Sequence, residues 1–92
     1  MSEYWERKVR RIMEGSARAQ RIGTVEHSGY RYEVRTDQRS LGYKSHYKPV
    51  KIYWIIGYKP DGTPFFGSSF TAASYAKHTA DAKAKLGVTF PA

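Results

Sequence analysis

The chain has 92 residues, which is room for a single domain with one modest hydrophobic core. Sixteen Lys and Arg residues stand against eight Asp and Glu, so the formal net charge is +8. There is no cysteine, which excludes disulfides, thiolate nucleophiles and cysteine-based zinc sites and suits a reducing cytoplasm. The first residues contain no apolar stretch of the kind a secretory signal needs, and the longest apolar run, Ile52 to Ile56, is far shorter than the roughly 20 residues of a membrane span. We expect a soluble, cytoplasmic protein with no membrane partner.

The positive charge itself suggests a class of partner. An excess of one sign repels itself in the compact state, so a polyanion is the usual reason for it. A basic surface that only aids solubility has the same composition, and composition does not separate the two interpretations.

Residues 1–15 predict an amphipathic basic helix, with Ser2 as its N-cap and Gly15 as its stop. Its apolar face has the spacing of a helix and consists of Trp5, Val9, Ile12 and Met13. Arg7, Arg10 and Arg11 fall on the other side. That side suits either contact with phosphates or exposure to solvent on a helix that covers the domain.

Antiparallel strands are predicted over residues 22–68, beginning with a hairpin over residues 22–34 that turns at His27-Ser28-Gly29. After the turn, apolar and charged residues alternate, so one face of the strand packs and the other meets solvent or a ligand. Arg31 and Arg35 belong to that second face.

Residues 36–49 show no clear periodicity and predict a long loop, and loops of this length are uncommon unless they carry a function. Arg39, Lys44 and Lys48 are interleaved there with Tyr43 and Tyr47. Cations meet phosphates and aromatic rings stack on bases, so the composition suits contact with nucleic acid. A solvated loop explains it equally.

Residues 50–58 predict the strongest strand, Pro60-Asp61-Gly62 predicts a turn, and residues 63–68 predict the partner strand. Both faces of the strong strand are apolar, with Trp54 and Tyr58 on one and Tyr53 on the other. Such a strand is either covered on both sides or presents an aromatic face to a partner, and the sequence leaves open whether Trp54 and Tyr53 are core or ligand-facing.

A final helix is predicted over residues 71–86, capped by Thr71 and ended by Gly87. Its polar stripe is expected to consist of Ser74, Lys77, His78, Asp81 and Lys85. The opposite, alanine-rich side is expected to pack on the sheet and holds Ala72, Tyr75, Ala76, Thr79, Ala80 and Leu86. The fold class is therefore α+β in one domain, residues 1–92: an N-terminal helix, a three- to four-stranded antiparallel sheet and a C-terminal helix on the sheet.

Three stretches in the second half carry a family pattern: the strand KIYWIIGY, the turn PDG and the run FFGSSFTAASYAKHTADAKAKLG. They resemble the ethylene-response-factor (Apetala) DNA-binding domain of plants and its phage relatives, and are similar to the arm-binding domains of tyrosine integrases. In that family a three-stranded sheet enters the major groove while its helix backs the sheet. By position, the resemblance implies DNA contacts from Arg31, Arg35, Trp54, Tyr58 and Phe65.

The chain departs from this pattern in two ways. Residues 66–70 hold one residue more than the family element, and the exposed sheet face is aromatic and aliphatic where the family is rich in arginine. The element order also fits the double-stranded-RNA-binding fold, but residues 71–75 lack the basic signature of that fold.

No residue pattern indicates catalysis. His27, His46 and His78 fall on a turn, a loop and a helix without the i, i+4 pairing of a helical metal site. The acids lack paired spacing and no glycine-rich phosphate loop is present, so we expect no enzyme activity, no metal and no cofactor.

The sequence thus predicts a small basic non-catalytic protein that binds double-stranded DNA, with RNA as a further partner, through an arginine and aromatic sheet face. The expected contact residues are Arg7, Arg10, Arg11, Arg31, Arg35, Arg39, Lys44, Lys48, Trp54, Tyr58 and Phe65. The alternative is a small phage-type inhibitor or adaptor that binds a host nucleic-acid-processing protein. A homodimer through the strong strand or the first helix is compatible with either.

Overall fold

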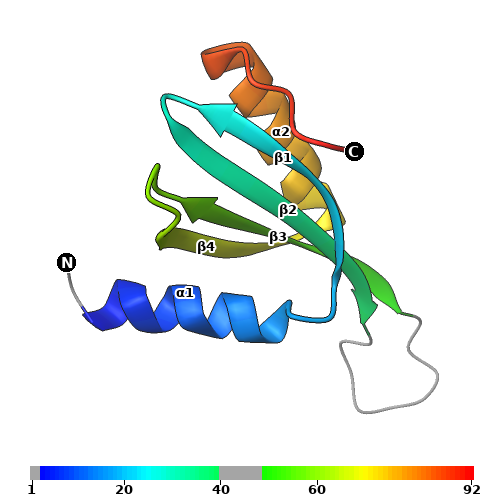
Figure 1. The fold of residues 1–92 in the computed structure, drawn as a ribbon. Coiled ribbons are helices and arrows are strands. Elements are labelled where there is room, and N and C mark those ends of the chain that lie inside the picture. Colours follow the sequence, from blue (N-terminus) through cyan, green and yellow to red (C-terminus); the bar gives the residue numbers. More distant parts are fainter. Residues whose placement is uncertain (1–2, 40–48) are drawn as a thin grey trace.

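The computed structural model describes residues 3–39 and 49–92, and its elements follow one another as a helix, four strands and a helix (Figure 1). They are α1 (Glu3–Gly15), β1 (Gln20–His27), β2 (Tyr30–Arg39), β3 (Val50–Tyr58), β4 (Pro64–Thr71) and α2 (Ala72–Leu86). Each strand pairs antiparallel with the next, in the order β1-β2-β3-β4. The predicted α+β class is confirmed.

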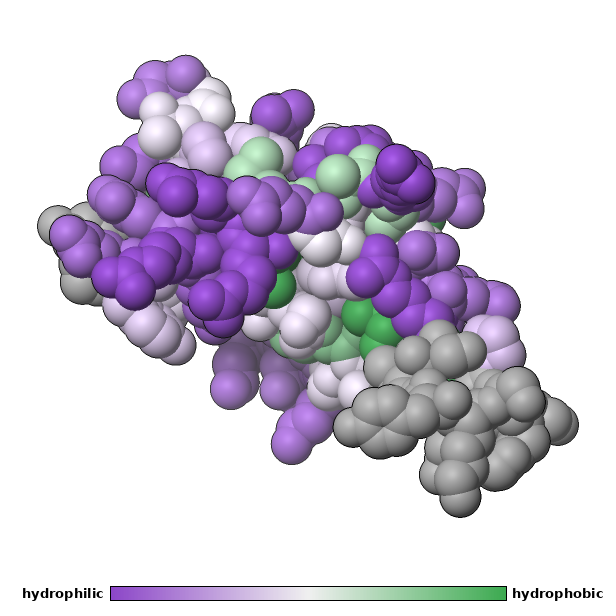
Figure 2. Space-filling view, turned by 90° about the horizontal axis from the view of Figure 1, so that it is seen from below, coloured by the Kyte–Doolittle hydropathy of each residue, from purple (hydrophilic) through white to green (hydrophobic). Residues whose placement is uncertain are grey.

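The two helices cover opposite faces of the sheet. α1 packs on β4, where Gly67 lets it come close: a Cβ on this glycine would lie 3.1 Å from the Cβ of Ile12. α2 packs through Tyr75, whose ring stacks on Tyr53 with 4.0 Å between centroids. Gly67 pairs with Ile56, three residues from Tyr53, so the two helices contact opposite faces. The surface on the α1 side is mostly hydrophilic, with small hydrophobic areas between polar side chains (Figure 2).

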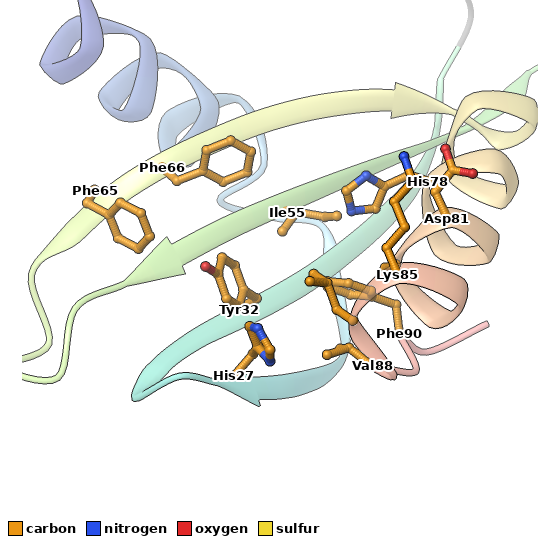
Figure 3. Close-up of a pocket in the computed structure, with 12 residues that line it drawn as sticks. His27, Tyr32, Ile55, Phe65, Phe66, His78, Asp81, Lys85, Val88 and Phe90 are labelled. Atoms are coloured by element: carbon orange, nitrogen blue, oxygen red, sulfur yellow. The ribbon is translucent and has the colours of Figure 1, made fainter.

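The core on the α2 side is largely aromatic. Its buried members are Val34, Tyr53, Ile55 and Tyr75, and the half-buried residues packed against them are Ile22, Tyr32, Phe66, Phe70 and Phe90. Figure 3 shows part of this layer beside a cavity. On the α1 side, Trp54 and Ile56 are buried as well. β3 is therefore covered on both faces, which decides the question that the sequence left open: Trp54 and Tyr53 are both core.

Both predicted turns, at residues 27–29 and 60–62, are confirmed. Ser28 and Gly29 have φ values of 54° and 84°, as a two-residue hairpin turn requires. Gly62 has a φ of 90°, and the Thr63 amide donates to the Asp61 carboxylate at 2.9 Å. Hydrogen bonds from Thr63 lower the pKa of Asp61.

The expected loop over residues 36–49 is wrong in its first part. Residues 36–39 continue β2 and pair with residues 50–53 of β3. The Thr36 hydroxyl also donates to the Ile52 carbonyl at 3.0 Å. The strand thus extends because β3 offers it a partner. Ser2, the expected N-cap, lies outside the described residues. β1 begins two residues earlier than predicted and β4 ends at Thr71 rather than residue 68.

α2 has the predicted caps but a different rotation. The Thr71 side chain accepts from the Ser74 amide and Gly87 adopts the left-handed conformation, with a φ of 69°. The alanines expected on the sheet, Ala72, Ala76 and Ala80, are exposed, as is Leu86. The buried side chains are Tyr75 and Ala82, with His78 half-buried beside them. The large ring of Tyr75 sets the rotation, because stacking it on Tyr53 buries far more surface than the alanines would.

Candidate nucleic-acid interface

All eight arginines lie on the α1 side of the molecule. They belong to α1, to the α1–β1 connection or to the sheet face that α1 covers: Arg7, Arg10, Arg11, Arg18, Arg21, Arg31, Arg35 and Arg39. Six of the eight acids share that side, namely Glu3, Glu6, Glu14, Glu26, Glu33 and Asp37. Net charge alone therefore does not mark a binding surface, and the surroundings of each arginine decide which ones a ligand reaches.

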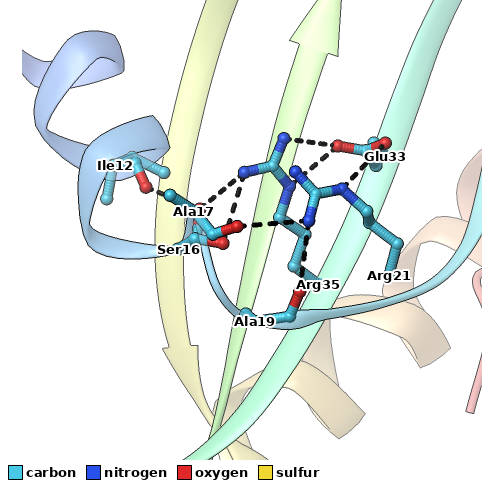
Figure 4. A network of polar contacts seen from close by, with 7 residues as sticks. All are labelled: Ile12, Ser16, Ala17, Ala19, Arg21, Glu33 and Arg35. Carbon is cyan, nitrogen blue, oxygen red and sulfur yellow. Dashed lines mark hydrogen bonds and ion pairs between the residues drawn. The ribbon is translucent and has the colours of Figure 1, made fainter.

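Arg35 is held inside the fold (Figure 4). It is 5% exposed, and its guanidinium contacts the Glu33 carboxylate at 2.8 and 2.7 Å. The same group donates to the carbonyl and hydroxyl of Ser16 at 3.3 and 3.2 Å. Ser16 is fully buried and donates in turn to the Ile12 carbonyl at 2.7 Å. Arg35 thus ties β2 to the end of α1.

Two further arginines bind the end of α1 and the connection that follows it. Arg39 donates to the Gly15 carbonyl at 2.6 Å, and Arg21 donates to the carbonyls of Ala17 and Ala19 at 3.3 Å. The last carbonyls of a helix lack partners within it and carry partial negative charge, so cations stabilise them. α1 has no basic residue in its own last turn, and arginines from β1 and β2 take that place. We call Arg21, Arg35 and Arg39 the arginine clamp.

Burial corrects two of the expected contact residues. The sequence places Arg35 and Trp54 on the DNA-contacting surface, whereas both are 5% exposed and lie in the interior. Trp54 lies beneath the Arg39 guanidinium, 4.9 Å from its ring centroid. Alternation along a strand shows which residues share a face but not what covers that face, and here α1 and the clamp cover it.

The other predicted contact residues of the sheet, Arg31, Tyr58 and Phe65, do not all lie on one surface. Arg31 is exposed and lies 4.7 Å above the ring of Tyr58, so these two share one surface as predicted. Phe65 does not join them. The β3–β4 register shifts between Gly57 and Tyr58, and the Phe65 ring lies against Gly57 and Tyr32 on the α2 face. Lys44 and Lys48 lie outside the described residues.

A hollow of about 420 Å³ runs beside α1 and carries the candidate interface. Among the described residues its lining consists of Tyr4, Arg7, Lys8, Arg11 and Ile12, with three cations and no acid. Tyr4 is 65% exposed, and its ring lies edge-on to that of Trp5, with 5.5 Å between centroids. We call this feature the cationic hollow.

Sequence reasoning identified Arg7 and Arg11 but missed Tyr4 and Lys8. The four residues stand at i, i+3, i+4 and i+7, which places them on one helical stripe, so the signal was available. The predicted polar side of the helix groups Arg10 with Arg7 and Arg11 instead. Arg10 lies on the other side of the helix, among Glu6 and Glu14.

The acid nearest the cationic hollow is Glu3. It pairs with Arg7 at 3.1 Å, and the two side chains are 84% and 68% exposed. An ion pair this exposed contributes about 0–1 kcal/mol, so a phosphate can replace the carboxylate. The pair therefore leaves Arg7 available to a ligand.

Among residues 3–39 and 49–92, no group of three or more His, Cys, Asp or Glu could hold a metal ion. Within the same residues, no helix is long and apolar enough to cross a membrane. No protein-family model matches this sequence, and neither a curated protein nor a solved structure matches it.

Proposed function

We propose that this protein is a small non-catalytic nucleic-acid-binding protein that binds duplex DNA through the outer side of α1. The observation that carries the proposal is the cationic hollow, where Arg7, Lys8 and Arg11 surround an exposed tyrosine ring without an acid in the lining. Guanidinium groups suit phosphate because they donate two parallel hydrogen bonds, and they keep their charge at every physiological pH.

The proposed interface lies on α1, whereas the sequence predicted a DNA-binding face on the sheet. Tyr53 and Trp54, two of the rings that suggested a sheet interface, are core and do not reach a ligand. Arg31, exposed beside Tyr58 on the same side of the molecule, extends the proposed surface. Contacts to phosphate position a protein on a duplex but carry little sequence information, so we expect weak sequence preference.

Salt dependence tests the proposal directly. Each phosphate contact on duplex DNA contributes about −0.9 to the slope of log affinity against log salt concentration. Replacing two phosphate-binding arginines, as Arg7→Gln/Arg11→Gln, should therefore reduce the steepness of the slope by about 1.8. The affinity should be measured at several salt concentrations on duplex DNA, with single-stranded DNA and RNA beside it.

The matched control removes the same charge from the other side of the molecule. Lys77 and Lys83 are exposed on α2, and Lys77→Gln/Lys83→Gln should leave the slope unchanged. Equal losses in the two double variants would show that net charge, rather than the cationic hollow, drives binding. Weak binding that does not respond to salt would refute nucleic-acid binding. The alternative partner, a host nucleic-acid-processing protein, stays a prediction, and a stoichiometric partner recovered regardless of nuclease treatment would favour it.

A further inference from the structure

A second hollow lies on the opposite face of the sheet, between β1–β4, α2 and the chain after α2 (Figure 3). Its volume is about 420 Å³. Four aromatic rings line it, from Tyr32, Phe65, Phe66 and Phe90, and Ile55 adds an aliphatic wall. We call this feature the aromatic cavity.

Small residues and a fixed tail keep the aromatic cavity open. The rings of Phe65 and Tyr32 lie directly over Gly57, where a Cβ would come within 2.9 and 3.1 Å of them. On α2 the lining residue is Ala82, which is buried but too short to fill the space. The chain after α2 is held in place because the Tyr75 hydroxyl donates to the Pro91 carbonyl.

Its size and composition are those of a ligand site. Small-molecule sites typically occupy about 300–1,000 Å³, with mostly apolar and aromatic walls and a few polar groups that orient the ligand. The aromatic cavity has this make-up.

The polar groups indicate the charge of the ligand. His27 from β1 and His78 and Lys85 from α2 can donate hydrogen bonds, while Asp81 is the one carboxylate in the lining. Among the ion pairs of the described residues, Lys85 takes no part. Lys85 supplies the positive charge and the two imidazoles supply further donors, so a ligand group beside Lys85 that accepts hydrogen bonds and carries negative charge fits this part of the lining.

We propose that the aromatic cavity binds a small, flat aromatic anion, with its rings among Phe65, Phe66 and Phe90 and its anionic group toward Lys85 and His78. The site is independent of the proposed nucleic-acid interface because the sheet separates the two. Binding at one site is therefore measurable in variants that have lost the other.

Two dyes with the same ring system test this proposal. 8-Anilinonaphthalene-1-sulfonate carries a negative charge, and N-phenyl-1-naphthylamine has the same rings without it. Fluorescence titration should show one site per chain for both dyes, with tighter binding of the sulfonate. Lys85→Gln should weaken sulfonate binding about two- to fivefold, as loss of a partly exposed charge pair does, and leave the naphthylamine unchanged. Arg7→Gln/Arg11→Gln should change neither, which excludes adsorption to the basic helix.

Blocking variants complete the test. Ala82→Leu extends a larger side chain into the aromatic cavity and should abolish binding of both dyes while circular dichroism shows a folded chain. If that variant does not fold, Leu86→Trp replaces it, since Leu86 is 56% exposed at the rim and its enlargement does not strain the core. Binding that survives the blocking variant, or many weak sites per chain, would overturn the proposal. Equal losses of both dyes in Lys85→Gln would overturn the assigned anionic group.

Discussion

Replacing Arg35 by alanine is expected to destabilise the protein far more than replacing Arg31, although the two lie on the same face of one strand. The Arg35 side chain is 6% exposed and contacts Glu33 and Ser16. Its loss leaves the Glu33 carboxylate, only 17% exposed, with Arg21 at 4.0 Å as its nearest partner. Breaking a buried ion pair costs about 3–5 kcal/mol, and Arg21 offsets part of this, so we expect about 3 kcal/mol.

Urea denaturation followed by circular dichroism measures this difference. Domains of this size have unfolding free energies of about 5–15 kcal/mol, so the loss is a large fraction of the total. In a thermal scan each kcal/mol corresponds to about 4–8 °C, which predicts a decrease of about 12–24 °C in Tm for Arg35→Ala. Arg31→Ala removes only an exposed cation–π contact with Tyr58 and should cost about 0.5–1 kcal/mol.

A double-mutant cycle with Glu33→Gln separates the ion pair from other effects of Arg35. Because the two residues contact each other, the double variant should lose less stability than the sum of the single variants. A structural role for Arg35 is refuted if the unfolding free energy of Arg35→Ala stays within about 1 kcal/mol of the wild type while its duplex affinity falls as strongly as in Arg7→Gln/Arg11→Gln. That outcome would mean that Arg35 faces a ligand in solution.

Three smaller predictions follow from other contacts. Gly67→Ala should cost about 1–3 kcal/mol in urea denaturation, because the added methyl meets Ile12 at 3.1 Å and forces α1 outward. Glu3→Gln removes the carboxylate that competes for Arg7 and should raise duplex affinity at low salt, with the gain fading as salt increases. Burial raises the pKa of Tyr75 from 10.0 to about 12, so its neutral phenol stabilises the fold fully below pH 10 and this contribution is lost as pH rises toward 12. Tyr75→Phe should therefore lose less unfolding free energy than the wild type between pH 10 and 12.

Helix ends and turns could be read from the sequence because their chemistry is local. Thr71 caps α2 with its own hydroxyl, Gly87 ends the helix in a conformation that favours glycine, and Ser28-Gly29 forms the hairpin turn. The bounds of β3 follow in the same way from a dense run of β-branched and aromatic residues. The order of helix, strands and helix required nothing more.

Contacts between segments far apart in the sequence could not be predicted from local patterns. Residues 36–39 lack alternation, yet they form strand because β3 pairs with them. The predicted packing side of α2 is right for Tyr75 but wrong for Ala72, Ala76 and Ala80. The stack of Tyr75 on Tyr53 turns Ala82 and His78 toward the sheet in their place. The aromatic cavity depends on six separate segments and has no counterpart in any local pattern.

The sequence by itself determined that this is a basic α+β domain with two helices, the second capped by Thr71 and Gly87, and a doubly apolar strand. It also placed Arg31 and Arg35 on one face of one strand, and nothing in their spacing distinguishes them. Only the tertiary structure assigned them different roles, because the end of α1 meets the sheet at Arg35 and leaves Arg31 exposed. The carbonyls of a helix end and of the turn after it lie close together in space, and the arginine next to them becomes part of the fold.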